Sequence, residues 1–402
     1  MKDIIQSYFI NNNDEIEFEL TTILSSSSHK NSFNEELSEI IHSHTEAIKR
    51  ILCSEKESNI YYIGLYTNDY IRKKFTELNE LEQKRGYLKS HLSQLKQLEL
   101  PEQRSKEWYE MRENVLTASS LADALGKGHF NTRDDLLIDK TSKEQKPFII
   151  NDIIQWGVKY EPVATEFYEK MNNLRIVEFG LVPHPTFNIF GASPDGICDE
   201  DSPKEYIGRM LEIKCPPKRK FTHEVPKHYW MQMQGQLEVC DLEECDFLQV
   251  KIEEYSCIRE YEKDVLFDNG IQHGKTSEGL PKGLVLEYTV DDVLTYKYSP
   301  WLSSVDDILN WRNNMVQELG VSCKEKWWKI TRYECTLVRR DREWWNSVVP
   351  DIIGFWGDVV HYRKVGNEEV QKRINGRKRG PRKKIFTVQE PLKGYLMDSD
   401  EE

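Results

Sequence analysis

Apolar residues recur at helical spacing through the first hundred residues of the chain. Leu37, Ile41, Ile48 and Leu52 fall on one face of a helix with about 3.6 residues per turn. Further on, leucines repeat near a seven-residue period that Gly86 interrupts, at Leu78, Leu81, Leu88, Leu92, Leu95 and Leu98. We interpret residues 1–100 as a helical accessory region packed on the main domain. A coiled coil for a partner is the alternative, but the stripe is shorter than the heptad runs that such coils need.

From residue 101 onward the pattern alternates between helical and strand periods. A helix is expected over 152–171, with an apolar stripe formed by Trp156, Tyr160, Ala164, Phe167 and Met171. Strands are expected within 176–197 and at 206–214, joined by a polar turn, and a helix at 226–240 precedes an alternating strand at 246–253. This order of elements predicts an α/β (α+β) fold with a mixed sheet flanked by helices.

The last third of the chain divides into three stretches. Residues 255–325 are acidic and glycine-rich with little periodicity, and we expect an insertion there. Residues 327–364 read as a strand and an aromatic-rich helix that complete a core domain spanning 101–364. Residues 365–402 are basic and then acidic, as in disordered tails. The basic cluster of this tail suits either DNA contact or nuclear import, through Arg377, Lys378, Arg379, Arg382, Lys383 and Lys384.

The bulk composition excludes some classes of protein and leaves others open. No apolar run reaches the length of a membrane span, and the N-terminus lacks the layout of a signal peptide. The eight cysteines include no CxxC pair, which indicates reduced thiols and an intracellular location, cytoplasmic or nuclear. The net charge of −13 excludes a uniformly basic surface, but a local basic groove for nucleic acid remains compatible with it.

Candidate chemistry gathers in residues 191–214, GASPDGICDEDSPKEYIGRMLEIK. Asp195 lies in a Pro-Asp-Gly turn, and Glu212 and Lys214 project from the same side of a strand because side chains alternate along it. Phosphodiester hydrolysis by two metals uses carboxylates that bridge cations about 4 Å apart. Asp195, Glu212 and the backbone carbonyl of Ile213 form an oxygen donor set that selects Mg²⁺, or Mn²⁺ as a substitute. Lys214 would hold the attacking water and offset negative charge.

Residues 101–126 contain a candidate phosphate site. Trp108 and Arg112 are four residues apart on one helix face, and the hydroxyls of Thr117, Ser119 and Ser120 can cap the short helix that follows. An arginine beside a hydroxyl-rich helix start suits a phosphate. Taken alone, plain capping with a surface arginine explains the pattern better.

Five ordered blocks carry a family resemblance: QRSKEWYEMRENVLTAS, WGVKYEPVA, GASPDGI, LEIKCP and YWMQMQGQLEV. Together they resemble the lambda-exonuclease or YqaJ-type viral recombinase nucleases of the PD-(D/E)xK superfamily. The resemblance covers roughly residues 101–254. It implies a restriction-endonuclease-like core and a Mg²⁺-dependent exonuclease that degrades the 5′-ended strand of linear duplex DNA.

The resemblance also implies roles for individual residues. It makes Glu161, Asp195 and Glu212 metal ligands, Lys214 the catalytic lysine and Gln232 an active-site positioner. Arg112 and Ser119, with Trp108 beside them, match the positions that seat a terminal 5′-phosphate. By resemblance, the partners are duplex DNA with 5′-phosphorylated ends, a single-strand annealing protein and further copies of the chain in a trimer.

The leading hypothesis is therefore a Mg²⁺-dependent 5′→3′ exonuclease in recombination, repair or viral genome processing. In a viral protein, the location would be the replication compartment. Two alternatives stay open. The first is an endonuclease or an RNA-directed nuclease on the same core, because metal chemistry does not choose the substrate. The second is a catalytically inactive protein that binds DNA ends.

Overall fold

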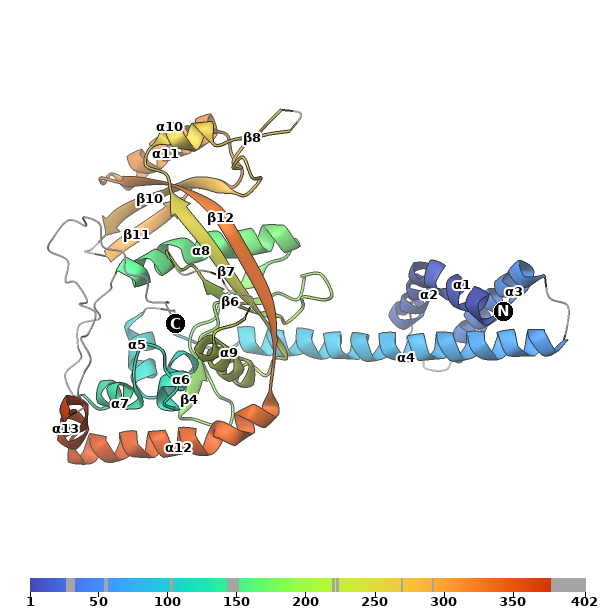
Figure 1. Cartoon of the computed structure of the whole chain (residues 1–402), viewed down its shortest axis with the longest axis horizontal. Coiled ribbons are helices and arrows are strands. Elements are labelled where there is room, and N and C mark those ends of the chain that lie inside the picture. The colour runs from blue at the N-terminus through green and yellow to red at the C-terminus, as the bar shows by residue number, and fades with distance from the viewer. Residues whose placement is uncertain are drawn as a thin grey trace. The chain divides into compact units, whose positions relative to one another are not determined.

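The computed structural model forms two compact units, Met1–Gln94 and Leu95–Glu402 (Figure 1). It describes residues 1–26, 33–53, 57–101, 103, 105–142, 152–218, 221, 224–268, 270–290 and 293–376. The six basic residues singled out between 377 and 384 lie outside these ranges, and their contact with DNA stays a prediction. Within the described ranges, no helix is both long enough and apolar enough to cross a membrane.

The first unit is helical, as the apolar spacing predicted. It contains α1 (Lys2–Asn11), α2 (Asn13–Ser26), α3 (Phe33–Leu52) and α4 (Glu57–Lys96). Leu37 and Ile48 are buried in its core, with Ile41 and Leu52 packed at the edge. The leucine stripe lies on α4 except for Leu98, which follows its end, and α4 continues through Gly86 without a break. That this region packs on the main domain stays a prediction.

The second unit is built on a mixed sheet, as predicted. Its seven strands run in the order β11-β10-β12-β7-β6-β5-β2 in the described part of the chain. Only β6 and β7 pair in parallel; the other neighbours in this sheet are antiparallel. The strands are β2 (Ile176–Val177), β5 (Gly196–Cys198), β6 (Met210–Lys214), β7 (Glu244–Glu254), β10 (Lys282–Val290), β11 (Val293–Tyr298) and β12 (Lys324–Arg339).

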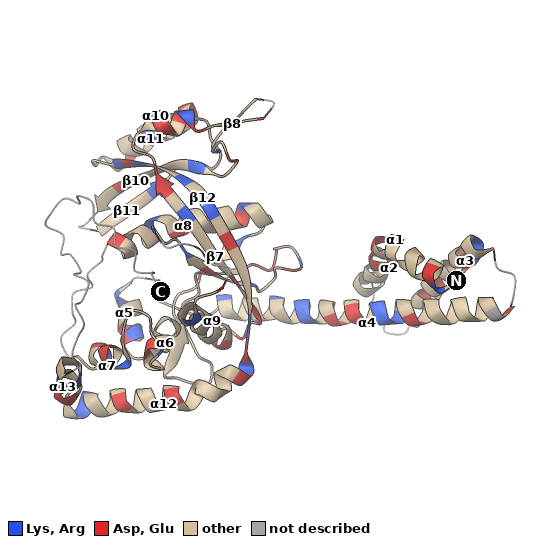
Figure 2. Cartoon of the chain, in the orientation of Figure 1, with Lys and Arg blue, Asp and Glu red and all other residues tan. Residues whose placement is uncertain are grey.

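Two smaller sheets accompany the main one. β1 (Leu116–Thr117), β4 (Phe190–Ala192) and β3 (Val182–Pro183) form one, and β8 (Leu266–Phe267) pairs with β9 (Ile271–Gln272) in the other. The helical elements are α5 (Lys106–Glu113), η1 (Ala118–Ser120), α6 (Leu121–Ala124), α7 (Arg133–Thr141), α8 (Asp152–Asn172), α9 (Lys227–Val239), α10 (Ile258–Lys263), α11 (Val305–Leu319), α12 (Arg342–Val365) and α13 (Glu368–Gly376). Both α4 and α12 carry charged residues of both signs along their length (Figure 2).

The two faces of β6, an inner strand of the main sheet, lie in different environments. Leu211 and Ile213 point into the hydrophobic core, where α8 contributes Tyr160 and Phe167. Glu212 and Lys214 therefore project to the opposite face, because strand side chains alternate. Helix α9 covers that face and approaches β4 closely at Gly235, where a Cβ would lie 2.9 Å from the Phe190 ring. The polar pair thus lies beneath a tightly packed helix.

One expected boundary is wrong, and one segment has more regular structure than expected. Residues 255–325, expected as an insertion with little periodicity, supply β10 and β11 to the main sheet and α10 and α11 to a core cluster around Leu284 and Leu286. That they are an insertion stays a prediction. Burial of both faces of β10 removes the polar alternation that marks a half-exposed strand. Residues 368–376, expected in the disordered tail, form α13, where Val370 is fully buried and Arg373 pairs with Asp134 at 3.2 Å. Met171, expected in the buried stripe of α8, is 41% exposed.

Candidate active site

Asp195 lies in the turn between β4 and β5, where the sequence placed it. Its Oδ2 accepts a hydrogen bond of 2.6 Å from the amide of Ile213 in β6. The adjoining Gly196 pairs with Leu211, so the expected antiparallel pairing of these two segments is confirmed. Burial and the nearby charge of Glu212 raise the pKa of Asp195 well above its ordinary value, and Lys214 opposes this shift only in part. The positive charge near Asp195 therefore does not offset the effect of burial and of Glu212 on its pKa.

Glu212 is fully buried and accepts three contacts. Its Oε1 accepts from Gln232 Nε2 at 2.7 Å and pairs with the ammonium of Lys214. Its Oε2 accepts from Gln236 Nε2, also at 2.7 Å. Both glutamines come from α9 and lie one turn apart on the face toward β6. A carboxylate with this many donors is fixed in position.

Gln236 is a site residue that sequence reasoning did not assign. The available signal was its spacing from Gln232, because residues four apart on a helix share a face. The ionised carboxylate of Glu212 only accepts hydrogen bonds, which forces the NH₂ group of Gln236 toward it. The Oε1 of Gln236 is consequently left buried, with no hydrogen-bond partner in the described part of the chain.

Lys214 carries the positive charge of the cluster. Its ammonium pairs with Glu212 and lies 5.1 Å from the centre of the Tyr229 ring. Burial alone would lower the pKa of Lys214, but the carboxylates of Glu212 and Asp195 outweigh it and raise that pKa. The side chain therefore stays protonated and is suited to stabilising negative charge, not to accepting a proton.

Glu161 projects from α8 and acts on the same cluster. Its charge contributes to the raised pKa values of Asp195 and of the buried thiol of Cys215. In the described ranges, however, no three His, Cys, Asp or Glu side chains are gathered closely enough to hold a metal ion. The ligand roles of Glu161, Asp195, Glu212 and the Ile213 carbonyl stay predictions. The donor set fits a hard divalent cation in its chemistry, because all its members are oxygen donors and the positive charge of Lys214 only partly offsets the effect of Glu212 on the half-buried Asp195.

The structure brings Trp108, Arg112 and Ser119 together as the sequence predicted. The Arg112 guanidinium lies 4.3 Å from the Trp108 ring centre, and its Nη2 donates to Ser119 Oγ at 3.4 Å. The expected capping is wrong, because neither Thr117 nor Ser120 caps a helix with its side chain. Instead, Thr117 Oγ1 bonds to the hydroxyls of Ser119 and Ser120, at 3.1 and 3.3 Å. A guanidinium and a cluster of hydroxyls converge here.

Two further cations hold the end of α5, the helix that carries Arg112. Lys140 Nζ donates to the carbonyl of Arg112 at 2.5 Å, and Arg363 Nη2 donates to that of Glu113 at 2.6 Å. These are last-turn carbonyls, which lack partners inside the helix. Burial and the charge of Arg112 lower the pKa of Lys140 to about 8. Sequence reasoning missed both residues because they lie 28 and 250 positions from the groups they contact.

A chain of contacts links this cationic group to the carboxylates. Trp108 Nε1 donates to Ser193 Oγ at 3.4 Å, and Gln236 Nε2 donates to the backbone carbonyl of Ser193 at 3.3 Å. Ser193 stands two residues before Asp195. The two halves of the predicted site are therefore parts of one constellation.

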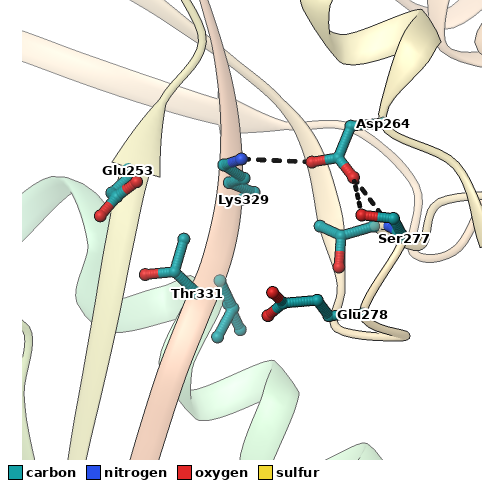
Figure 3. Close-up of a pocket in the computed structure, with 8 residues that line it drawn as sticks. Glu253, Asp264, Ser277, Glu278, Lys329 and Thr331 are labelled. Atoms are coloured by element: carbon teal, nitrogen blue, oxygen red, sulfur yellow. Dashed lines mark hydrogen bonds and ion pairs between the residues drawn. The ribbon is translucent and has the colours of Figure 1, made fainter.

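A cavity of about 220 Å³ lies elsewhere in the unit (Figure 3). In it, Asp264 accepts from the amide of Ser277 at 2.7 Å, from its hydroxyl at 2.9 Å and from Lys329 at 3.2 Å. These bonds join the 264–278 segment to β12, and they give the cavity a structural role.

Comparison with known proteins found a matching family model and similar proteins. Residues 107–243 match the family model of the YqaJ-like viral recombinase domain. An uncharacterized protein of Acanthamoeba polyphaga mimivirus is 29% identical over 333 residues, which cover 74% of this chain and 60% of that protein. The chain thus spans 60% of the length of this relative.

Solved structures show more distant similarity. An alkaline exonuclease from Laribacter hongkongensis is 21% identical, with a TM-score of 0.39 over 67% of this chain and 100% of that one. A phage-related exonuclease from Haemophilus somnus is 11% identical, with a TM-score of 0.33 over 64% of this chain and 96% of that one.

Proposed function

We propose that the protein, whose residues 107–243 match the family model of the YqaJ-like viral recombinase domain, is a Mg²⁺-dependent exonuclease that degrades the 5′-ended strand of linear duplex DNA. The observation that carries the proposal is the group formed by the fully buried Glu212 with the half-buried Asp195 and the half-buried, protonated Lys214. Such a group is costly to bury, which favours a catalytic role over a purely structural one.

Asp195 and Glu212, with Glu161, would hold the divalent cation. When bound, the cation supplies a Lewis acid and lowers the pKa of a coordinated water. Lys214 stays protonated beside the carboxylates and would stabilise negative charge that develops on the phosphodiester. Gln232 and Gln236 hold Glu212 in place from α9. This positioning matters because a small displacement of a catalytic group strongly lowers the reaction rate.

The proposed strand polarity rests on the group formed by Arg112 and Ser119. A guanidinium with a neighbouring hydroxyl cluster suits the planar recognition of a terminal phosphate. Trp108 stacks under the guanidinium and contacts Ser193, close to Asp195. A 5′-phosphate bound at Arg112 would therefore place the DNA end within the same constellation as the carboxylates.

The enzyme claim is tested on a linear duplex and a covalently closed circle of the same sequence, each incubated with Mg²⁺. We expect the wild-type protein to degrade only the linear form and Lys214→Ala to degrade neither. Failure of the wild type to cut either substrate would contradict the claim. Cleavage of the circle would indicate an endonuclease on the same core.

The polarity claim has its own assay, because an exonuclease could start from either end. Linear duplexes with a 5′-phosphate on one strand and a 5′-hydroxyl on the other are labelled at each 3′ end. We expect the phosphorylated strand to shorten first in the wild type and this bias to disappear in Arg112→Gln. Preferential loss of the 3′ labels at the earliest times would refute the 5′→3′ direction.

A further inference from the structure

A row of aromatic rings leads from the protein surface to the ammonium of Lys214. It consists of Phe130 and His129, from the loop between α6 and α7, and His228 and Tyr229, from the start of α9. We propose that the exposed end of this row, called here the aromatic ladder, stacks the bases of unpaired DNA beside the carboxylate centre. The inference rests on the proposed function in one respect, the use of Lys214 as part of a nuclease site.

The rings of the aromatic ladder are in continuous contact. The ring centres of Phe130 and His129 are 4.6 Å apart, and His129 stacks on His228 at 5.0 Å with an interplanar angle of 10°. His228 then contacts Tyr229 at 4.0 Å, and the Tyr229 ring lies 5.1 Å from the Lys214 ammonium. These spacings match those of interacting aromatic pairs. The ladder thus connects the solvent to the proposed site of chemistry.

Phe130 is 77% exposed, so its ring contributes little to burial on folding. The loop that carries it is nevertheless anchored. At its start, the amide of Lys127 donates to the carbonyl of Ala122 at 2.8 Å. At its end, Thr132 and Asp135 form a capping box on α7. A loop held at both ends presents Phe130 to solvent at a small additional entropic cost, as a preformed binding surface requires.

The loop tip is also held against Asp123. A Cβ on Gly128 would lie 2.4 Å from the backbone carbonyl oxygen of Asn131 and 1.9 Å from Asp123 Oδ1, so only glycine fits this approach. Asn131 Nδ2 donates to Asp123 Oδ2 at 3.4 Å. Both contacts flank His129 and Phe130 in sequence, and they position the two rings at the mouth of the ladder.

The chemistry of the surface favours nucleobases as its occupant. In the described part of the 125–132 loop and of α9, Phe130 is the only strongly exposed large apolar side chain. A protein partner would need a wider apolar patch. Stacking needs only ring faces, and every base offers one. The exposed Lys127 and Lys227 adjoin the ladder in sequence and supply positive charge for the accompanying phosphates.

The proposal is tested by binding to the full-length protein in EDTA, so that no hydrolysis is required. The probes are a labelled single-stranded 12-mer of mixed sequence and a 12-mer of abasic sites with the same phosphates. We expect Phe130→Ala to weaken binding of the base-containing strand about 5-fold or more and to leave the abasic strand unchanged. Phe130→Trp should bind the base-containing strand at least as tightly as the wild type.

Phe267→Ala is the matched control, because Phe267 is 76% exposed and lies on β8, outside the ladder. Its affinities should equal those of the wild type. Equal weakening on both probes, an unchanged affinity of Phe130→Ala for the base-containing strand, or no wild-type binding would each overturn the proposal. The result is separable from the nuclease claim, since an inactive protein can still stack bases and an active one can fail to do so.

Discussion

Replacing Gln236 by leucine removes one hydrogen bond from the buried Glu212 and keeps roughly the same side-chain volume. Gln236 is 1% exposed and donates to Glu212 Oε2 at 2.7 Å. No water can take its place readily, because Glu212 has no exposed surface. The substitution therefore isolates how much the position of this carboxylate contributes to the reaction.

The expected loss of stability follows from the contacts. A hydrogen bond to a charged group contributes about 1.5–3 kcal/mol. Glu212 keeps its contacts with Gln232 and Lys214. The substitution also removes the 3.3 Å hydrogen bond to the Ser193 carbonyl, and it takes the unpartnered Oε1 of Gln236 out of the interior. We therefore expect the free energy of unfolding to fall by only about 1–2 kcal/mol.

Gln234 on the same helix is a matched control. It is also 1% exposed, and its amide bonds the Arg339 carbonyl at 2.9 Å and the Asp341 amide at 2.6 Å. Loss of two ordinary hydrogen bonds in Gln234→Leu should cost about 2 kcal/mol, close to the loss in Gln236→Leu. The two variants thus differ mainly in whether Glu212 is affected.

The assay combines denaturant unfolding with initial rates on linear duplex at saturating DNA and Mg²⁺. We expect Gln236→Leu to lower kcat about 10-fold or more and Gln234→Leu to change it by less than about 2-fold. KM should change little in either variant, because neither side chain is proposed to bind DNA. Equal losses of kcat in the two variants would refute the reasoning and assign the effect to packing of α9.

Three further predictions concern the cations of the site. Arg112→Gln should abolish the rate advantage of 5′-phosphorylated over 5′-hydroxyl ends while hydroxyl ends are cut as before; a retained advantage would place the phosphate elsewhere. The pKa of Lys140 is lowered from 10.5 to about 8, so between these pH values the unfolded chain binds more protons than the folded one. The free energy of unfolding should therefore gain a rising contribution over this range, and Lys140→Met should lack it when the two proteins are unfolded at pH values within the range. Lys214→Met leaves the fully buried Glu212 and the half-buried Asp195 without their cation and should cost about 3 kcal/mol at neutral pH. The loss should be smaller at mildly acidic pH, because the raised pKa of Asp195 lets that group take up a proton; equal losses at both pH values in denaturant titrations would contradict this.

The carboxylate centre was largely predictable because its parts are close in sequence. Asp195, Glu212 and Lys214 lie within twenty residues, across one turn and one strand pair. Strand alternation decides which of them share a face. Gln232 on α9 was placed beside them by the family resemblance and not by periodicity. Local periodicity was therefore enough for the three residues of the strand pair.

The strands within residues 255–325 show where periodicity is insufficient to predict secondary structure. In β10, Leu284 and Leu286 pack on one face and Val285 on the other, so no polar position marks the strand. Such a run has no period that separates it from a loop or a buried helix. Its place between β11 and β12 depends on pairing with residues about forty positions away.

What the sequence determined by itself was the local chemistry, namely which carboxylates, lysine and glutamine face one another, and that Trp108 and Arg112 share a helix face. Only the tertiary structure decided that Lys140 and Arg363 hold the end of that helix, and that Ser193 links it to Gln236. The physical reason is the distance along the chain over which each effect acts. Backbone geometry sets the direction of side chains within a few residues, whereas contacts between distant segments form only when whole elements pack.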